Sequence, residues 1–196
     1  MTLNEIANKH KTDKGSWHHG YAAIYDTYFT PLRGLPIRLA EIGIGGYHYP
    51  DRGGESLKMW DEYFTKAEII GVDIHVKLGL DNDRVQTYVC NQTDERLQKI
   101  TGVCDIIIDD ASHINNLTIA TFELLWPMVA VGGFYVVEDT ETSYWEVASD
   151  GTDFKGGSHP DTVMNYFKAK TDLLNLTESD IEFIHFYKGL IILKKK

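Results

Sequence analysis

Short runs of β-branched and other apolar residues alternate along this chain with segments whose apolar residues have helical spacing. Such runs, bounded by turn residues, are typical of strands buried on both faces of a parallel sheet. Helices between the strands favour an α/β domain with helices on both faces of that sheet. Strands are expected at residues 38–43, 68–74, 85–90, 104–108 and 134–137, and helices at 56–64, 94–100 and 117–128, the last followed by a turn at Gly132-Gly133. The sequence therefore predicts a three-layer, Rossmann-like α/β fold.

The end of the chain breaks this alternation. Apolar runs at residues 181–187 and 190–193 flank only Lys188 and Gly189, which predicts an antiparallel hairpin. A mainly parallel sheet closed by a hairpin is typical of class I methyltransferases, whereas nicotinamide dehydrogenases usually continue with parallel βα units. The chain of 196 residues suits one domain. We expect a single domain over 1–196, with two short helices (2–10 and 21–29) in an N-terminal cap over a ligand (1–36) and a Rossmann-like core (37–196).

The charge balance excludes some partners. There are 19 basic and 29 acidic residues, giving a net charge of −10, and the only basic run is Lys194-Lys195-Lys196. This argues against nucleic acid or an anionic membrane as the main partner. No secretory signal and no apolar run of ~20 residues is visible. With Cys90 and Cys104 expected as buried, reduced thiols, the sequence predicts a cytoplasmic protein.

Glycines follow the first expected strand at Gly43, Gly45 and Gly46, and Asp73 ends the second strand. Glycines at this place let the backbone approach a ligand, and the acid can accept both ribose hydroxyls. The next helix begins only after residue 54, so no helix N-terminus directly follows the glycines to hold a pyrophosphate. This departure favours S-adenosylmethionine, which has no phosphate, over NAD.

Three further residues fit such a cofactor. Glu41 lies one pleat before the glycines, where an acid usually orders this loop. Gln92 follows the third strand, where an adenine edge would lie, although ordinary loop polarity explains it equally well. Asp109 ends the fourth strand, where its carboxylate would receive the amino group of the methionine moiety.

Two strands end in pairs of acids, Asp109-Asp110 and Glu138-Asp139, and His113 follows the first pair. Parallel strands meet at one edge of a sheet, so these side chains are expected together. Adjacent carboxylates repel unless a cation lies among them, and oxygen ligands favour Mg²⁺, with Ca²⁺ or Mn²⁺ as alternatives. The competing interpretation is that Asp110 or Ser112 caps a helix starting near Asn115.

With these residues established, the chain resembles the metal-dependent sugar O-methyltransferases of macrolide and related glycoside biosynthesis, a branch of the class I methyltransferases. The matching stretches are Thr12-Asp13-Lys14-Gly15, 41–47 (EIGIGGY), 53–60 (GGESLKMW), Gly71-Val72-Asp73, 107–113 (IIDDASH), 132–140 (GGFYVVEDT) and Thr142-Ser143-Tyr144-Trp145.

The resemblance implies a magnesium site at Asp110, Glu138 and Asp139, with His113 as the general base. It also implies S-adenosylmethionine bound against Glu41, the glycine loop, Asp73 and Asp109, and it adds Tyr47 and Ser56 to the cofactor set. Ala111 stands where a glycine is usual. We expect the auxiliary N-terminal domain of the macrolide enzymes to be missing, so the acceptor need not be a macrolide.

The acceptor is expected to be a small molecule, a sugar or glycoside of natural-product or polysaccharide biosynthesis. Tyr144 and Trp145 would form an aromatic wall for it, with core packing as the alternative. His18 is a further candidate contact, and residues 150–160 form either a lid or a plain surface loop. A catechol-like acceptor, an NAD(P)-dependent reductase and a non-catalytic cofactor- or metal-binding module remain alternatives. Homo-oligomer formation is left open.

Overall fold

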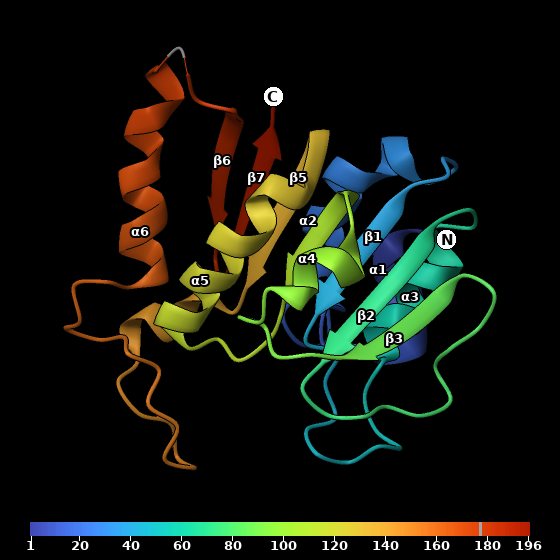
Figure 1. Ribbon diagram of the computed structural model, residues 1–196. Coiled ribbons are helices and arrows are strands. Elements are labelled where there is room, and N and C mark those ends of the chain that lie inside the picture. The colour runs from blue at the N-terminus through green and yellow to red at the C-terminus, as the bar shows by residue number, and fades with distance from the viewer. Residues whose placement is uncertain (177) are drawn as a thin grey trace. The chain divides into compact units, whose positions relative to one another are not determined.

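The computed structural model of the chain describes residues 1–176 and 178–196. These residues form two compact units, Met1–Cys90 and Asn91–Lys196, which we call the N-terminal and C-terminal units (Figure 1). Within the described residues no helix combines the length and apolar character needed to cross a bilayer. The expectation of a single domain with a cap over residues 1–36 stays a prediction.

Three parallel strands form the sheet of the N-terminal unit, in the order β3-β2-β1. They are β1 (Arg38–Ile42), β2 (Glu68–Asp73) and β3 (Val85–Val89). Leu39 pairs with Ile69 and Ile69 with Val85, and all three are buried. The expected strands are confirmed, each ending one residue earlier than predicted.

The helices of this unit are α1 (Leu3–His10), α2 (Tyr21–Phe29) and α3 (Glu55–Tyr63), with a 3₁₀ turn, η1, at Thr30–Leu32. The aromatic stripe of α2 is core, as its spacing predicts. The Tyr25 and Phe29 rings stack with centroids 5.3 Å apart, and Tyr25 meets Trp60 of α3 edge-on at 5.6 Å. These buried rings fix α2 against α3.

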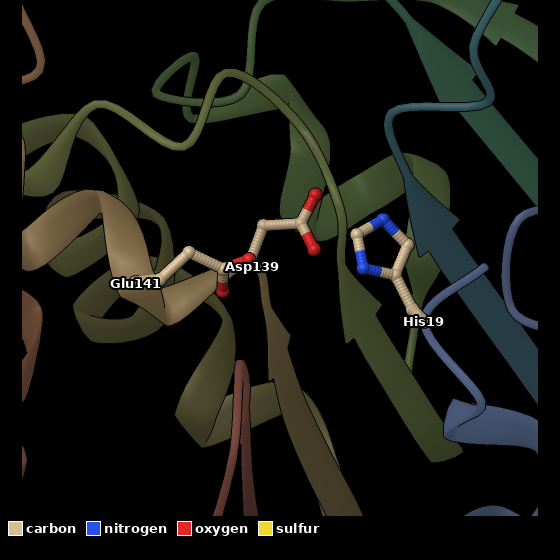
Figure 2. Close-up of side chains that lie close together, drawn as sticks. All are labelled: His19, Asp139 and Glu141. Carbon is tan, nitrogen blue, oxygen red and sulfur yellow. The ribbon is translucent and has the colours of Figure 1, made fainter.

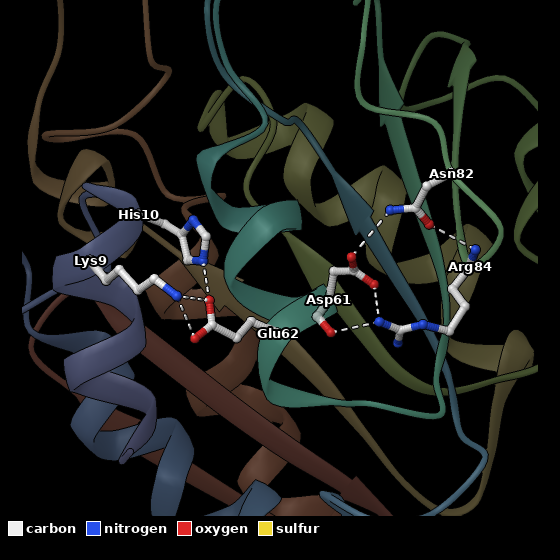
Figure 3. A network of polar contacts seen from close by, with 6 residues as sticks. All are labelled: Lys9, His10, Asp61, Glu62, Asn82 and Arg84. Atoms are coloured by element: carbon white, nitrogen blue, oxygen red, sulfur yellow. Dashed lines mark hydrogen bonds and ion pairs between the residues drawn. The ribbon is translucent and has the colours of Figure 1, made fainter.

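Polar contacts tie α3 to its neighbours at the surface of this unit (Figure 3). Glu62 accepts hydrogen bonds from Lys9 Nζ at 2.7 and 2.8 Å, and its Oε2 lies 2.7 Å from His10 Nε2. On the other side of α3, Arg84 bonds Asp61 through both the carboxylate and the backbone carbonyl. The exposed charges therefore connect α1 to α3, and α3 to the approach to β3.

In the C-terminal unit the strand order is β4-β5-β7-β6. The strands are β4 (Cys104–Asp109), β5 (Val129–Glu138), β6 (Ile181–Tyr187) and β7 (Leu190–Lys195). The β4 and β5 strands are parallel, while β7 runs antiparallel to both β5 and β6. The predicted hairpin is confirmed, with Gly189 in its turn at φ 72°.

The turn predicted at Gly132-Gly133 is wrong, because both glycines lie within β5. The pairing of β4 with β5 jumps from Cys104–Val129 to Ile106–Phe134, so the extra residues of β5 form a bulge. A Cβ on Gly133 would come within 2.8 Å of the Asp105 carbonyl oxygen. The glycine signal therefore marks a close approach of two strands.

The remaining elements are α4 (Arg96–Thr101), α5 (Asn115–Leu125), α6 (Val163–Lys170) and the 3₁₀ turns η2 (Trp126–Met128), η3 (Thr140–Tyr144) and η4 (Thr171–Asn175). The helix expected at 117–128 thus starts two residues earlier, and its last three residues are 3₁₀. Phe122 of α5 meets Tyr135 of β5 at 5.1 Å and Phe167 of α6 at 4.9 Å. These contacts pack α5 against β5 and α6 against α5.

Candidate functional site

A cluster of acids and one histidine lies where β4 and β5 end, within the C-terminal unit. Asp110, His113 and Asp139 each place a potential ligand atom within 4.8 Å of the others. His113 Nε2 is 3.5 Å from Asp139 Oδ2 and 3.9 Å from Asp110 Oδ1. All three are half-buried. The strand ends thus bring together side chains that are up to 29 residues apart.

Two more carboxylates border this cluster. Glu138, the last residue of β5, is buried, and one of its oxygens lies within 4.8 Å of one from Asp110. Glu141 lies equally near Asp139, and Figure 2 shows both side chains leaving the segment after β5. His19, also labelled there, belongs to the N-terminal unit. Sequence reasoning missed Glu141, whose only signal is its position two residues after Asp139.

The backbone is unusual at two of these residues. His113 has φ 56° and Asp139 has φ 52°, in the left-handed region that non-glycine residues seldom occupy. Such strain persists only where the surrounding structure holds it, and it concentrates at functional sites. The helix-capping interpretation is not supported, because the N-cap of α5 is Ile114, without a side-chain cap. Ser112 instead accepts a hydrogen bond from the Ile114 N–H at 3.3 Å.

Asp109 is set apart from these groups by burial. Its carboxylate is fully buried, and this burial raises its pKa to about 8, with the neighbouring Asp110 charge adding to the effect. The Ala111 N–H and the Tyr135 hydroxyl donate to its oxygens at 3.4 and 3.5 Å. Among the described residues, the groups able to hold a metal ion leave Asp109 out.

Within the N-terminal unit, Asp73 organises the loop that follows β1. Its Oδ2 accepts a hydrogen bond from the Ile44 N–H at 3.2 Å, and its Oδ1 accepts one from the His75 N–H at 2.8 Å. Gly43, Gly45 and Gly46 all have positive φ. A Cβ on Gly46 would lie 2.1 Å from the Arg52 carbonyl oxygen. The loop is therefore built to fold tightly on itself, and only glycine fits at residue 46.

Glu41 on β1 lies in a fully buried polar cluster. Its Oε1 is 3.3 Å from Lys14 Nζ, and its Oε2 accepts a hydrogen bond from Trp60 Nε1 at 3.0 Å. Lys14 comes from the loop between α1 and α2 and has no exposed surface. Sequence reasoning gave Lys14 no role, although it lies in the Thr12–Gly15 stretch.

The other cofactor candidates have different surroundings. Tyr47 is 83% exposed, while its carbonyl oxygen accepts a hydrogen bond from the buried Lys77. Ser56 is buried in the first turn of α3. Gln92, in the C-terminal unit, donates from Nε2 to Thr121 Oγ1 at 2.9 Å, so its side chain already has a fixed partner on α5.

The expected acceptor wall is open to solvent. Tyr144 and Trp145 are 62% and 50% exposed, so neither is a core residue. The Trp145 ring meets Phe154 at 5.8 Å. Residues 146–160 are irregular, and their base is fixed by hydrogen bonds from Phe154 N to Glu146 O and from Gly157 N to Ser143 O. In the N-terminal unit, His18 packs against Trp17 and His19.

Comparison with known proteins shows what this chain is similar to. No family model matches it. An 8-demethyl-8-(2-methoxy-alpha-L-rhamnosyl)-tetracenomycin-C 3'-O-methyltransferase of Streptomyces olivaceus is 44% identical over 146 residues, 72% of this chain and 37% of that protein. An 8-demethyl-8-alpha-L-rhamnosyl tetracenomycin-C 2'-O-methyltransferase of the same species is 35% identical, over 99% of this chain and 54% of that protein.

A solved structure agrees with these relatives. The MycE methyltransferase of the mycinamycin biosynthetic pathway, in complex with Mg, SAH and mycinamycin VI, superimposes with a TM-score of 0.90 at 33% identity. The match covers 100% of this chain and 54% of that chain. The chain therefore spans about half the length of its relatives, or less.

Proposed function

This chain belongs to the family of sugar O-methyltransferases of antibiotic biosynthesis, and we propose that it transfers a methyl group from S-adenosylmethionine to a hydroxyl of a sugar or glycosylated small molecule. The family and its Rossmann-like class I methyltransferase fold confirm the resemblance drawn from the sequence. The observation that carries the proposal is the grouping of Asp110, His113 and Asp139 beside the buried Glu138.

Asp110, Glu138 and Asp139 are the proposed ligands of a divalent cation, with Mg²⁺ as the first choice. Carboxylate oxygens are the donors that hard divalent ions prefer, and these three gather at one strand edge within ligand distance of their neighbours. Their negative charges repel one another, so the residues fit a cation. When bound, such an ion lowers the pKa of an acceptor hydroxyl.

His113 is the proposed general base. Its Nε2 lies beside the Asp110 and Asp139 carboxylates, so the proposed base and two of the proposed metal ligands are grouped at one place. The left-handed backbone at His113 aims the side chain from the loop between β4 and α5 rather than from the helix itself.

In the N-terminal unit the proposed cofactor contacts are Glu41, Gly43, Gly45, Gly46, Tyr47, Ser56 and Asp73. In the C-terminal unit they are Gln92 and Asp109. Each Asp73 oxygen accepts one backbone hydrogen bond and keeps a lone pair for a ribose hydroxyl. Methyl transfer from a sulfonium is an in-line displacement, so holding the two reactants in place supplies much of the rate.

Tyr144 and Trp145 of the C-terminal unit are the proposed stacking surface for the acceptor. In the N-terminal unit, His18 is a further candidate contact. The S. olivaceus relatives are named for rhamnosyl acceptors, and the MycE complex contains mycinamycin VI, which supports a glycoside over a catechol. The single-domain organisation, independence from nucleic acid and membranes, homo-oligomer formation and a cytoplasmic location stay proposals. The last is supported by the buried free thiols of Cys90 and Cys104.

The test is to incubate the chain with S-adenosylmethionine, MgCl₂ and a panel of rhamnosides, other glycosides and catechols, and to detect methylated products by mass spectrometry. Calorimetric titrations with S-adenosylmethionine and NADH run in parallel. We expect the chain to bind S-adenosylmethionine but not NADH, and to methylate a glycoside. Binding of NADH but not of S-adenosylmethionine would indicate a reductase. Methylation of catechols but of no glycoside would show that the acceptor is a catechol. Cofactor binding without any methylated product would indicate a non-catalytic module.

A further inference from the structure

Asn115, the first residue of α5, has a completely buried side chain whose hydrogen-bonding capacity is fully used. Its Nδ2 donates to the carbonyl oxygens of Thr142 at 3.2 Å and Phe154 at 2.8 Å. Its Oδ1 accepts from Ser143 Oγ at 2.9 Å and from the Val163 N–H at 2.7 Å. An amide offers two donor hydrogens and two acceptor lone pairs, so all four are satisfied.

These bonds join segments that are far apart in the sequence. Thr142 and Ser143 belong to η3, which directly follows the proposed metal-ligand strand β5, and Val163 begins α6. Phe154 belongs to the irregular segment that follows Trp145, and its carbonyl oxygen also accepts from the Asn115 backbone N–H at 3.0 Å. Asn115 itself lies two residues after His113.

The segment held in this way folds around a hollow of its own. A cavity of about 610 Å³ is lined by residues 146–160 alone, among them Glu146, Asp153 and His159. Gly156 lets the segment pack on η3, because a Cβ there would lie 2.2 Å from the Thr142 carbonyl oxygen and 2.3 Å from that of Trp145. The base of the segment is therefore anchored twice.

We propose that Asn115 is a positioning residue for the acceptor: it fixes residues 145–160, with Trp145 and the adjoining hollow, relative to His113 and Asp139, so that the segment selects the glycoside presented to the base. This inference rests on the proposed function. Residues 150–160 are then part of a wall held by hydrogen bonds at its base, and not a freely moving lid.

The two donated and two accepted hydrogen bonds at this position match an amide side chain. In Asn115→Asp the Nδ2 donor becomes an oxygen: an ionised carboxylate has no donor hydrogen and a protonated one has a single O–H, for the carbonyl oxygens of both Thr142 and Phe154. The side chain keeps its size, so the substitution removes at least one of the two donated bonds without opening a cavity. Buried acceptors left without donors are costly, so the segment is expected to detach from α5.

The test combines amide hydrogen exchange, read by mass spectrometry, with steady-state kinetics on the glycoside that the wild-type chain methylates. In Asn115→Asp we expect exchange across residues 153–163 to accelerate at least tenfold while β4, β5 and β7 stay protected. The KM for the glycoside should rise at least tenfold and the KM for S-adenosylmethionine should stay within twofold. Gly156→Ala, which pushes the segment away from η3, should give the same pattern and serves if Asn115→Asp fails to fold.

Thr101→Val is the matched control, because it removes a buried hydrogen bond, from Thr101 Oγ1 to the Leu97 carbonyl oxygen, elsewhere in the same unit. It should leave exchange at 153–163 and both KM values unchanged. Unaltered exchange at 153–163 in Asn115→Asp and Gly156→Ala, or an equal rise in both KM values, would overturn the role of Asn115. A wild-type chain that binds S-adenosylmethionine but methylates no glycoside would overturn the proposed function, and the acceptor role of Asn115 with it.

Discussion

Replacing Lys14 by Met tests how much the buried ion pair with Glu41 contributes to the stability of the chain. Methionine has nearly the length of lysine and fills the same space, so the substitution removes the charge without opening a large cavity. The Glu41 carboxylate would keep the hydrogen bond from Trp60 Nε1 at 3.0 Å but lose the ammonium group 3.3 Å from its Oε1.

The magnitude follows from burial. Both side chains of the pair are at most 1% exposed. Removal of one partner from a buried ion pair typically costs about 3–5 kcal/mol, because the remaining charge is left in a poorly solvating interior. With a slope of about 2–3 kcal/mol per molar urea, the unfolding midpoint should fall by about 1–2.5 M. A typical domain has about 5–15 kcal/mol of stability, so the variant should still fold.

Urea unfolding is followed by tryptophan fluorescence, for which the buried Trp60 is a local reporter. The control is Lys9→Met, the same chemical change in the exposed pair with Glu62 (Figure 3), where Lys9 is 55% exposed. Exposed pairs contribute about 0–1 kcal/mol, so this variant should shift the midpoint little. In a double-variant cycle, Glu41→Gln should recover part of the Lys14→Met loss. Equal midpoint shifts in the Lys14 and Lys9 variants would refute the reasoning.

Two further predictions concern pH and catalysis. Burial and a hydrogen bond to Asp26 raise the pKa of Tyr63 to about 12. Between pH 10 and 12 the unfolded chain therefore loses the Tyr63 proton before the folded chain does. The free energy of unfolding should fall as the pH rises through this range. Urea midpoints at pH 9 and 11 should show a smaller decline in Tyr63→Phe than in the wild type, and identical declines would contradict this. His113→Ala should lower the methyl-transfer rate by about 10²–10⁴-fold. The affinity for S-adenosylmethionine, measured by calorimetry, should stay within twofold of the wild type. An unchanged rate would show that His113 is not the general base.

The strands and the hairpin could be predicted because their signals are local. Five short runs rich in apolar residues and one Lys-Gly turn indicate β-structure without knowledge of distant residues. The start of β5 could not be predicted in this way. Gly132 and Gly133 have the composition of a turn, and only the pairing with β4 shows that they form a bulge.

The same contrast holds for the candidate site. Asp110 and Asp139 follow strands, so their approach to one another could be expected from topology. Asn115 and Lys14 could not be identified, because their importance lies in contacts with distant parts of the chain. Asn115 is 39 residues from Phe154, and Lys14 reaches Glu41 on another element. Nothing in the local pattern separates Asn115 from an ordinary polar residue at a helix start.

The central claim is that the carboxylates after β4 and β5 hold a divalent cation needed for methyl transfer. The most direct measurement is the rate of methyl transfer to a glycoside from chain stripped with EDTA, as Mg²⁺ is added back. The account predicts a rate near background without metal, full recovery with Mg²⁺, and at least tenfold more Mg²⁺ needed for half-recovery in Asp139→Asn. The control Asp172→Asn, which alters an exposed carboxylate in η4, should behave like the wild type. A full rate in EDTA, or the same Mg²⁺ requirement in Asp139→Asn, would contradict the claim.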